Sequence, residues 1–321
     1  MTPSKGIADA HAMPESLLMA LLFLMLVWVI WGLSYPMTAF ALKGFDVMTL
    51  RCLAQLLGAG LLFLYALIRR HRLFVEREAW GDLMVAGLLN MAVLPIFFTF
   101  GVKLLGPGRT SILVYTMPIW ANLFARLFLG EALTLQRLSA LFLGLVAVGV
   151  MVSQDVSRIK DAPLGAALTL LAALAYGLGT VWFKRRRWLA PLVVVTFWQL
   201  AIGLVPLFAI WAVTTFPPDL ARVRAGEWGA LLFIGLLSNG IAYLAWFFVV
   251  QKLTAGISAL GSLAVPCLAV AFSSVLTRER LYPQDFAAMS MIGAALILVL
   301  AERVRAAPRL LALFSGRREE L

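Results

Sequence analysis

Charged residues are scarce in this chain of 321 residues, at 13% of the sequence, whereas hydrophobic residues make up 62%. The mean hydropathy is accordingly high, at +0.94. A water-soluble globular protein needs more charge on its surface, so this composition excludes that class. Histidine occurs only at His11 and His71, and the motifs HExxH, GxSxG and GxxxxGK are absent. We therefore expect that the protein is not an enzyme and that it holds no metal ion or cofactor.

Cysteine is equally scarce. Cys52 and Cys267 both lie in apolar segments, so no disulfide framework is predicted. The first sixteen residues contain one lysine and two prolines, which is a poor start for a signal peptide. The apolar run that follows is longer than the core of a cleaved signal, and we interpret it as a retained first membrane span.

Long apolar runs make up most of the sequence after the first sixteen residues. A helix needs about 20 apolar residues to cross the hydrocarbon of a bilayer. Ten such segments can be drawn, near residues 17–40, 47–68, 82–102, 110–129, 135–153, 163–183, 192–214, 229–250, 257–276 and 284–301. The sequence therefore predicts an all-α integral membrane protein of ten transmembrane helices.

The second half of the chain repeats the first at an offset of 148 residues. The coincident positions are Trp80 and Trp228, Gly81 and Gly229, Gly87 and Gly235, Gly108 and Gly256, Pro118 and Pro266, Glu131 and Glu279, and Gln136 and Gln284. We expect two five-helix repeats, at 17–153 and 163–301, flanked by tails at 1–16 and 302–321. Five spans are an odd number, so the halves should be inverted in the membrane. This architecture is typical of transporters and differs from that of channels.

The net charge of +11 is not gathered into a basic domain, so no nucleic-acid partner is expected. The basic residues lie in the loops between spans. With the N-terminus in the cytoplasm, sixteen fall on the cytoplasmic side and nine on the other. The clusters RRHR at 69 and KRRR at 184 share that side. Positive charge favours the cytoplasmic side, so both termini are predicted there.

The order and duplication of several motifs resemble a known family. They include FDVMTLR at 45–51, GEALT at 130–134, AYGLGTVWFKR at 175–185 and RERLYPQ at 278–284. The stretches from Trp80 to Val152 and from Trp228 to Glu302 each resemble an EamA repeat of the drug/metabolite transporter superfamily. The resemblance implies an inner-membrane carrier that works by alternating access and exports amino acids or related small metabolites. Other branches of the superfamily carry sugars and nucleotide sugars, so the cargo stays open.

Polar and aromatic side chains at helical spacing are the candidates for a substrate cavity. A polar group at the membrane midplane is costly unless it faces protein, solute or water. Stripes of this kind occur in the first, third, fourth, sixth, seventh and eighth spans. The candidate residues are Tyr35, Thr38, Asn90, Phe97, Tyr115, Asn122, Tyr176, Trp198, Gln199, Asn239, Tyr243 and Trp246. The alternatives are that aromatic residues anchor span ends and that Asn90 and Asn239 bond a neighbouring helix.

Six further residues are candidates for gating or structural roles. Pro118 and Pro266 predict helix kinks, and Glu131 and Glu279 predict ion pairs at span ends. Arg51 and Arg126 are the only charges placed deep in spans, and both are expected to snorkel. Arg51 is assigned a structural or gating role, while Arg126 has the alternative of holding a carboxylate at the cavity mouth. No acidic residue lies near the middle of a span, so no proton or sodium site is predicted.

The functional hypothesis is an exporter of neutral or zwitterionic metabolites, with amino acids leading, through an aromatic-lined central cavity. A carrier of sugars or nucleobases and a drug efflux carrier are the alternatives, and a non-catalytic receptor or scaffold ranks below them. The expected partners are a small-molecule substrate and the lipid bilayer. Small residues four apart, such as Ala173 and Gly177, favour close helix packing and leave a homodimer open.

Overall fold

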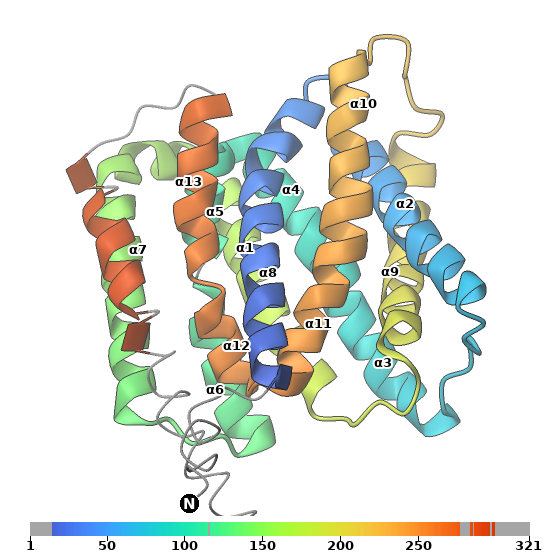
Figure 1. Ribbon diagram of the computed structural model, residues 1–321. Helices are drawn as coiled ribbons and strands as arrows, with labels where there is room; N and C mark the ends of the chain where they lie inside the picture. The colour runs from blue at the N-terminus through green and yellow to red at the C-terminus, as the bar shows by residue number, and fades with distance from the viewer. Residues whose placement is uncertain (1–14, 115, 277–282, 285, 296, 299–321) are drawn as a thin grey trace, which may run out of the picture.

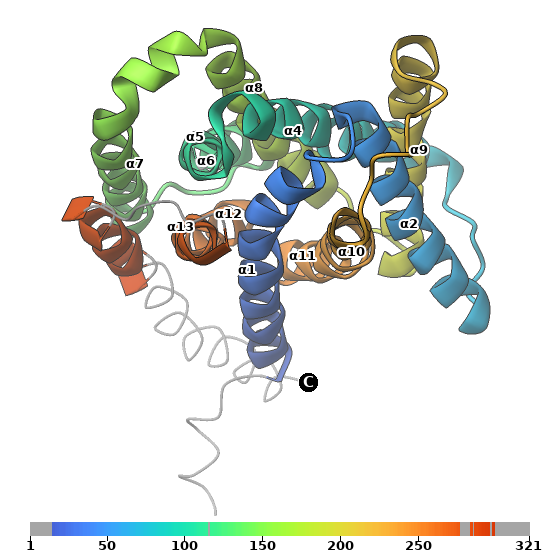
Figure 2. The same cartoon turned by 90° about the horizontal axis from the view of Figure 1, so that it is seen from above.

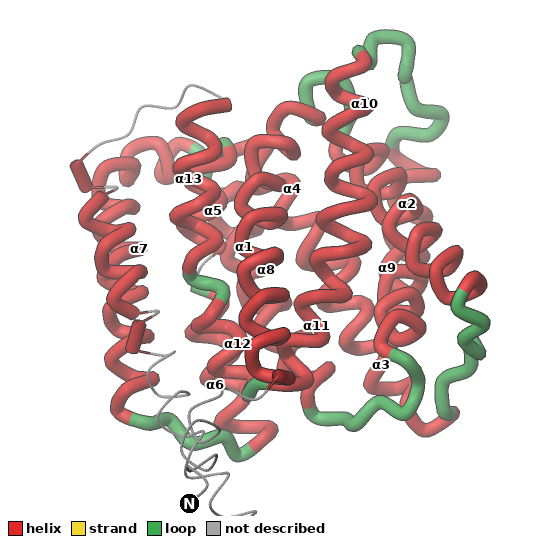
Figure 3. Tube along the Cα trace, viewed as in Figure 1, coloured by secondary structure: helices red, strands yellow, loops and turns green. Residues whose placement is uncertain are grey.

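The computed structural model describes residues 15–114, 116–276, 283–284, 286–295 and 297–298. Within this part of the chain every regular element is a helix (Figure 3). The first half contains α1 (Glu15–Ala41), α2 (Val47–Ile68), the 3-10 turn η2 (Arg77–Ala79), α3 (Trp80–Leu88), the π-helix η3 (Leu89–Val93), α4 (Leu94–Leu105), α5 (Pro107–Val114), α6 (Met117–Leu129) and α7 (Leu135–Asp161). The second half contains α8 (Pro163–Lys184), α9 (Leu192–Thr214), α10 (Ala225–Leu232), the π-helix η4 (Phe233–Ala242), α11 (Tyr243–Lys252), α12 (Ala255–Gly261) and α13 (Ala264–Leu276).

Seven helices of the described part are long and apolar enough to cross a membrane, including the continuous spans Arg77–Leu105 and Ala225–Lys252. Three further apolar helices are shorter, at Met117–Leu129, Leu135–Ala147 and Phe286–Ala295. The fourth predicted span is divided between α5 and α6, and Pro118, in the first turn of α6, has no N–H to continue the ladder of α5. The count of ten spans stays a prediction.

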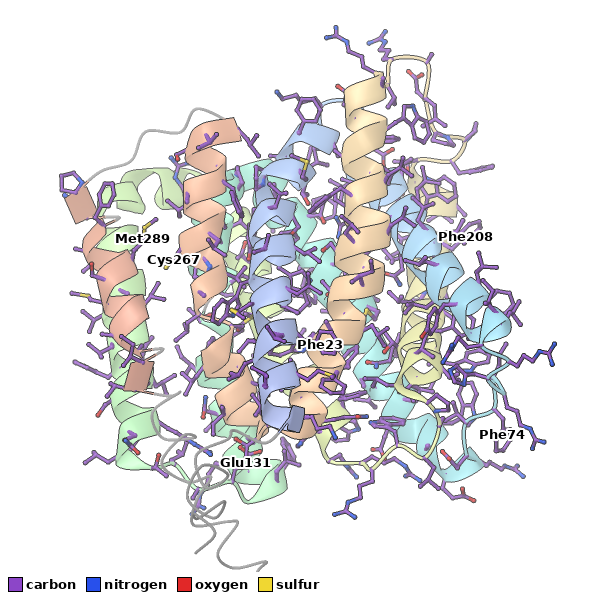
Figure 4. The ribbon with its side chains drawn as sticks, in the orientation of Figure 1. Phe23, Phe74, Glu131, Phe208, Cys267 and Met289 are labelled. Carbon is purple, nitrogen blue, oxygen red and sulfur yellow. The ribbon has the colours of Figure 1, made fainter. Side chains whose placement is uncertain are left out.

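Apolar side chains cover the outside of the bundle as well as its interior. Phe208 and Phe74, both labelled in Figure 4, point outward, and Phe208 is 51% exposed. Leu56, Leu64 and Phe142 are also exposed on their helices. A surface of this kind is stable only in a bilayer, where lipid replaces water against the apolar side chains. The protein is a multi-pass membrane protein.

Helix contacts made by glycine occur in reciprocal pairs between the halves. A Cβ added to Gly58 would lie 2.8 Å from Cβ of Asn239, and one added to Gly203 would lie 2.5 Å from Cβ of Met91. Positions 58 and 203 differ by 145, and positions 91 and 239 differ by 148, so the same contact recurs with the halves exchanged. Two more pairs of contacts recur in this way. Gly32 packs against Leu268 as Gly177 packs against Trp120, and Gly87 packs against Ile202 as Gly235 packs against Leu57. The packing therefore has an approximate two-fold symmetry.

The two π-helices continue this symmetry, because each lies within the third long helix of its half, between α3 and α4 or between α10 and α11. Seen from above, α1 stands between α13 and α10, opposite the row that includes α4 and α5 (Figure 2). In Figure 1 α1 begins at the bottom, where α6 also ends. We call this the lower end of the bundle, and the end at which α1 finishes the upper end.

Candidate substrate cavity

A cavity lies inside the bundle between helices of both halves. Its lining residues are Trp31, Ser34, Tyr35 and Thr38 of α1, Arg51 of α2, Leu94, Pro95 and Phe98 of α4, Val114 of α5, Met117 of α6, Tyr176 of α8, Ile234, Ser238 and Asn239 of η4, and Tyr243 of α11. About 80 Å³ of the space between them is open to the centre of a water molecule. At about 12 Å³ for each water centre, this volume holds roughly six waters or one small metabolite.

Aromatic rings form the lower wall of the cavity. The ring centroid of Trp31 lies 5.3 Å from that of Tyr243 and 5.5 Å from that of Trp246. Tyr176 lies 5.5 Å from Trp246 and packs edge-on against Trp31. Trp246 is 1% exposed and sits behind this wall. Rings in edge and tilted contact pack rigidly, so the wall presents apolar faces and phenolic edges to a bound molecule.

Polar groups occupy the sides of the cavity. Arg51 is 4% exposed, and neither its Nε nor its Nη2 has a hydrogen-bond partner in the described residues. The hydroxyl of Thr38 is also buried with no partner in the described part of the chain, whereas Ser34 donates to the carbonyl of Trp31 at 2.7 Å. Arg51 is the sole charged side chain among the described lining residues. The site thus offers donors and one cation to a solute.

Hydrogen bonds to α9 and a helix cap fix the turn of α2 that holds Arg51. Asp46 caps α2 by accepting from the backbone N–H groups of Met48 and Thr49, both at 3.0 Å. The Trp211 indole of α9 donates to the Thr49 hydroxyl at 2.8 Å in a buried contact. Thr49 and Arg51 are two residues apart, so they lie about 200° apart around the helix. The face that holds Thr49 is tied to α9, which leaves the face with Arg51 turned to the cavity.

The lower end of the bundle is closed by contacts between the halves. The Trp28 indole of α1 donates to the carbonyl of Gly261 at 2.8 Å, and Glu131 accepts from the backbone N–H of Ala255 at 2.8 Å. Arg137 donates to the hydroxyl of Thr254 at 3.2 Å and pairs with Glu131 at 3.5 Å. Figure 4 shows Glu131 at this end, well below the level of Cys267. The cavity therefore lies above a sealed lower end.

Five of the twelve candidate cavity residues line the cavity, namely Tyr35, Thr38, Tyr176, Asn239 and Tyr243. Trp246 supports the aromatic wall from behind. They come together because stripes on α1, α8 and the η4–α11 helix face one another. Ser34 and Ser238 also line it, and the spacing of Ser34 from Trp31 and Thr38 would have placed it on the same stripe.

The remaining candidates that the structure describes lie outside the cavity lining. Asn90 is buried beside Gly179, and its backbone carbonyl accepts from the hydroxyl of Tyr243 at 3.5 Å. Asn122 donates to the carbonyl of Pro118 in its own helix at 2.8 Å. Trp198 donates to the carbonyl of Leu73 at 2.8 Å. Gln199 is buried with no partner for its side-chain amide, Phe97 is partly buried against the core, and Tyr115 lies outside the described residues.

The residues that the sequence analysis assigned gating or structural roles lie in different parts of the structure. Arg51 lies in the cavity wall and does not snorkel, because its side chain is buried and α2 packs against α4, α9 and η4. Arg126 is exposed near the end of α6 and does not line the cavity. Glu131 joins the halves, as described above. Pro118 lies in the first turn of α6 and Pro266 near the start of α13, so each follows a break in its span, and Glu279 lies outside the described residues.

Comparison with known proteins identifies the family. The sequence profile of the EamA-like transporter family matches twice, over residues 18–153 and 163–301. The chain belongs to this family. The uncharacterized transporters YoaV and YvbV of Bacillus subtilis are 27% and 28% identical to it, over 79% and 87% of this chain and 87% and 90% of their own length.

The uncharacterized inner membrane transporter YedA of Escherichia coli is 22% identical over 85% of this chain and 88% of its own length. A crystal structure with 18% sequence identity matches with a TM-score of 0.72, over 89% of this chain and 98% of the other. At this identity the structural likeness shows the fold alone. The protein is thus a membrane transporter of the EamA family in the drug/metabolite transporter superfamily, and its relatives are named as transporters.

Proposed function

We propose that the protein exports small zwitterionic metabolites, with amino acids as the leading class, across the bacterial inner membrane. The observation on which this rests is the cavity itself, which takes lining residues from both halves and combines aromatic walls with hydroxyls, one amide and one cation. An apolar side chain fits against Trp31 and Tyr176, while the charged end of the solute finds donors at the sides.

Alternating access between two inverted halves of five spans each is the mechanism that we propose. The reciprocal glycine contacts support it, because halves packed in this way can rock about their common interface. With both termini in the cytoplasm, the sealed lower end is the cytoplasmic end, and the cavity belongs to a state that faces the periplasm. Export then ends with release upward, after which the lower end must open to load again.

Uptake of a panel of radiolabelled amino acids into proteoliposomes tests this function. We expect saturable uptake of at least one apolar or aromatic amino acid. Asn239→Ala should raise its KM about tenfold, the effect of losing one well-placed hydrogen-bonding group. Asn122→Ala is the matched control, because Asn122 is equally buried but bonds its own helix, and its KM should change less than about twofold.

Two results would count against the proposal. Uptake that is lost equally in both asparagine variants would mean that the loss is structural rather than local to the cavity. Absence of uptake of every amino acid, by protein shown to be folded and inserted, would exclude this substrate class. The panel would then turn to sugars, nucleobases and drug-like cations, the alternatives that the family permits.

A further inference from the structure

Arg51 is a buried cation, and no acidic side chain lines the cavity with it among the residues that the structure describes. The nearest acid along the chain is Asp46, whose Oδ1 accepts from two backbone N–H groups at the start of α2. A guanidinium removed from water in a membrane span is costly unless a partner compensates it. The described lining of the cavity supplies no anionic partner.

Arg51 lies in the wall of the cavity, and two of its donors have no partner in the described part of the chain. These donors are Nε and Nη2, and Thr38, Ser238 and Asn239 form part of the same wall. A guanidinium with two adjacent free N–H groups matches the two oxygens of a carboxylate.

We propose that Arg51 binds the carboxylate of the transported molecule, and that no charged group of the cavity recognises its amine. The substrate class is then a monocarboxylate with an apolar or aromatic body, whether or not it is an amino acid. This inference rests on the proposed transport through the cavity and specifies which part of the solute the cavity recognises by charge.

The shape of the cavity agrees with this class. From Thr38 to Trp31 the lining spans seven residues of α1, about 10 Å along the helix axis. The rings of Trp31, Tyr176 and Tyr243 line the same cavity as Arg51, so a solute whose carboxylate is bound there finds apolar faces for its body. An ammonium group there meets only hydroxyls, an amide and ring faces, whose attraction for a cation is weaker than that of a carboxylate.

Four matched ligands separate the two ends of the solute. L-Phenylalanine has both charges, 3-phenyllactate lacks the amine, L-phenylalaninamide lacks the carboxylate charge, and phenethylamine lacks the carboxylate altogether. Each is tested for thermal stabilisation of the purified wild-type protein and for competition with uptake. We expect 3-phenyllactate to act within about threefold of the concentration of L-phenylalanine. We expect the amide and the amine to need at least about tenfold more.

Variants of two arginines complete the test. Arg51→Gln should abolish stabilisation by the two carboxylates, and Arg51→Lys should retain part of it, because lysine keeps the charge but loses the paired donors. Arg126→Gln is the matched control, since Arg126 is exposed and lies outside the cavity, and it should bind both carboxylates as the wild type does. If Arg51→Gln does not fold, the comparison of acid with amide on the wild type decides alone.

The outcomes distinguish this inference from the proposed function. Equal potency of L-phenylalaninamide and L-phenylalanine, or unchanged carboxylate binding in folded Arg51→Gln, overturns the role of Arg51 while amino-acid transport stands. Stabilisation by 3-phenyllactate that depends on Arg51, without uptake of any amino acid, supports the inference and excludes amino acids as cargo. No stabilisation of the wild type by either carboxylate overturns the assignment.

Discussion

Removal of the Glu131 carboxylate should loosen the lower end of the bundle. Glu131 follows α6 in the first half and accepts from the backbone N–H of Ala255, at the start of α12 in the second half, at 2.8 Å. Its other oxygen lies 3.5 Å from Arg137, which in turn donates to Thr254. Their side chains are only 14% and 9% exposed. The contacts to Ala255 and Thr254 join the two halves, so they exist only while the lower end is closed and they stabilise that state.

The size of the effect follows from the number of bonds lost. A hydrogen bond to a charged, partly buried group contributes about 2 kcal/mol. Since 1.4 kcal/mol corresponds to a tenfold change in an equilibrium, Glu131→Ala should raise the population open at the lower end by up to about 30-fold. Glu131→Gln keeps an acceptor for the Ala255 N–H but loses the ion pair, and it should have an intermediate effect.

A cysteine at Ser258 would report this opening. Ser258 lies one turn into α12 and is fully buried, so a membrane-impermeant maleimide should reach Ser258→Cys only when the lower end opens. The labelling is measured in a background with Cys52→Ala and Cys267→Ala. Glu78→Ala, at an exposed acid of the same end, is the control. Labelling of the Glu131→Ala protein at the control rate, with lower thermal stability, would refute the gating role and leave only a structural one.

Three further sets of substitutions test the packing. Gly58→Ala and Gly203→Ala should each lower the free energy of unfolding by about 1–3 kcal/mol, because the added Cβ meets Asn239 or Met91. Gly60→Ala is the control, since its Cβ meets open space and should leave the stability unchanged. Equal stability of all three variants would contradict the close approach of the helices. Trp246→Ala should lower the free energy of unfolding by about 3–5 kcal/mol, and Phe208→Ala, at an exposed residue, by less than about 1 kcal/mol. The reverse order, measured by thermal unfolding, would contradict the aromatic wall. Trp211→Phe removes the donor to Thr49. It should lower the free energy of unfolding by about 1–2 kcal/mol and raise the KM for a carboxylate substrate. An unchanged KM would mean that this bond does not position Arg51.

Helical periodicity predicted much of the cavity because its residues lie on straight stripes. Tyr35 and Thr38 on α1, and Asn239 and Tyr243 across η4 and α11, are three or four residues apart and face the same space. Spacing alone does not tell which stripe faces the interior. Trp198 lies on a comparable stripe, yet its indole is bound to the carbonyl of Leu73, at the loop after α2.

Arg51 and Asn122 show which information the sequence lacked. The sequence predicts that an arginine five residues from a helix start snorkels, and burial by α4, α9 and η4 prevents this. Asn122 donates one amide N–H to the carbonyl of Pro118 one turn earlier, and it is not among the residues that line the cavity. Both outcomes depend on which neighbours the tertiary fold supplies, a property that is not periodic along the chain.

The symmetry of the packing does not extend to the chemistry of the cavity. The offset of 145 that relates Gly58 to Gly203 places Thr196 at the position equivalent to Arg51, and the Thr196 hydroxyl is bonded within its own helix, to the carbonyl of Leu192 at 2.8 Å. The offset of 148 places Pro95 opposite Tyr243. Close approach of helices constrains both halves alike, because both must pack against the same partner surface. A bound solute has no such symmetry, so one half can supply the cation while the other supplies most of the ring wall. A carrier built in this way holds a solute in one orientation, with its anionic end toward α2, and this orientation is what the acid and amide pair of ligands measures.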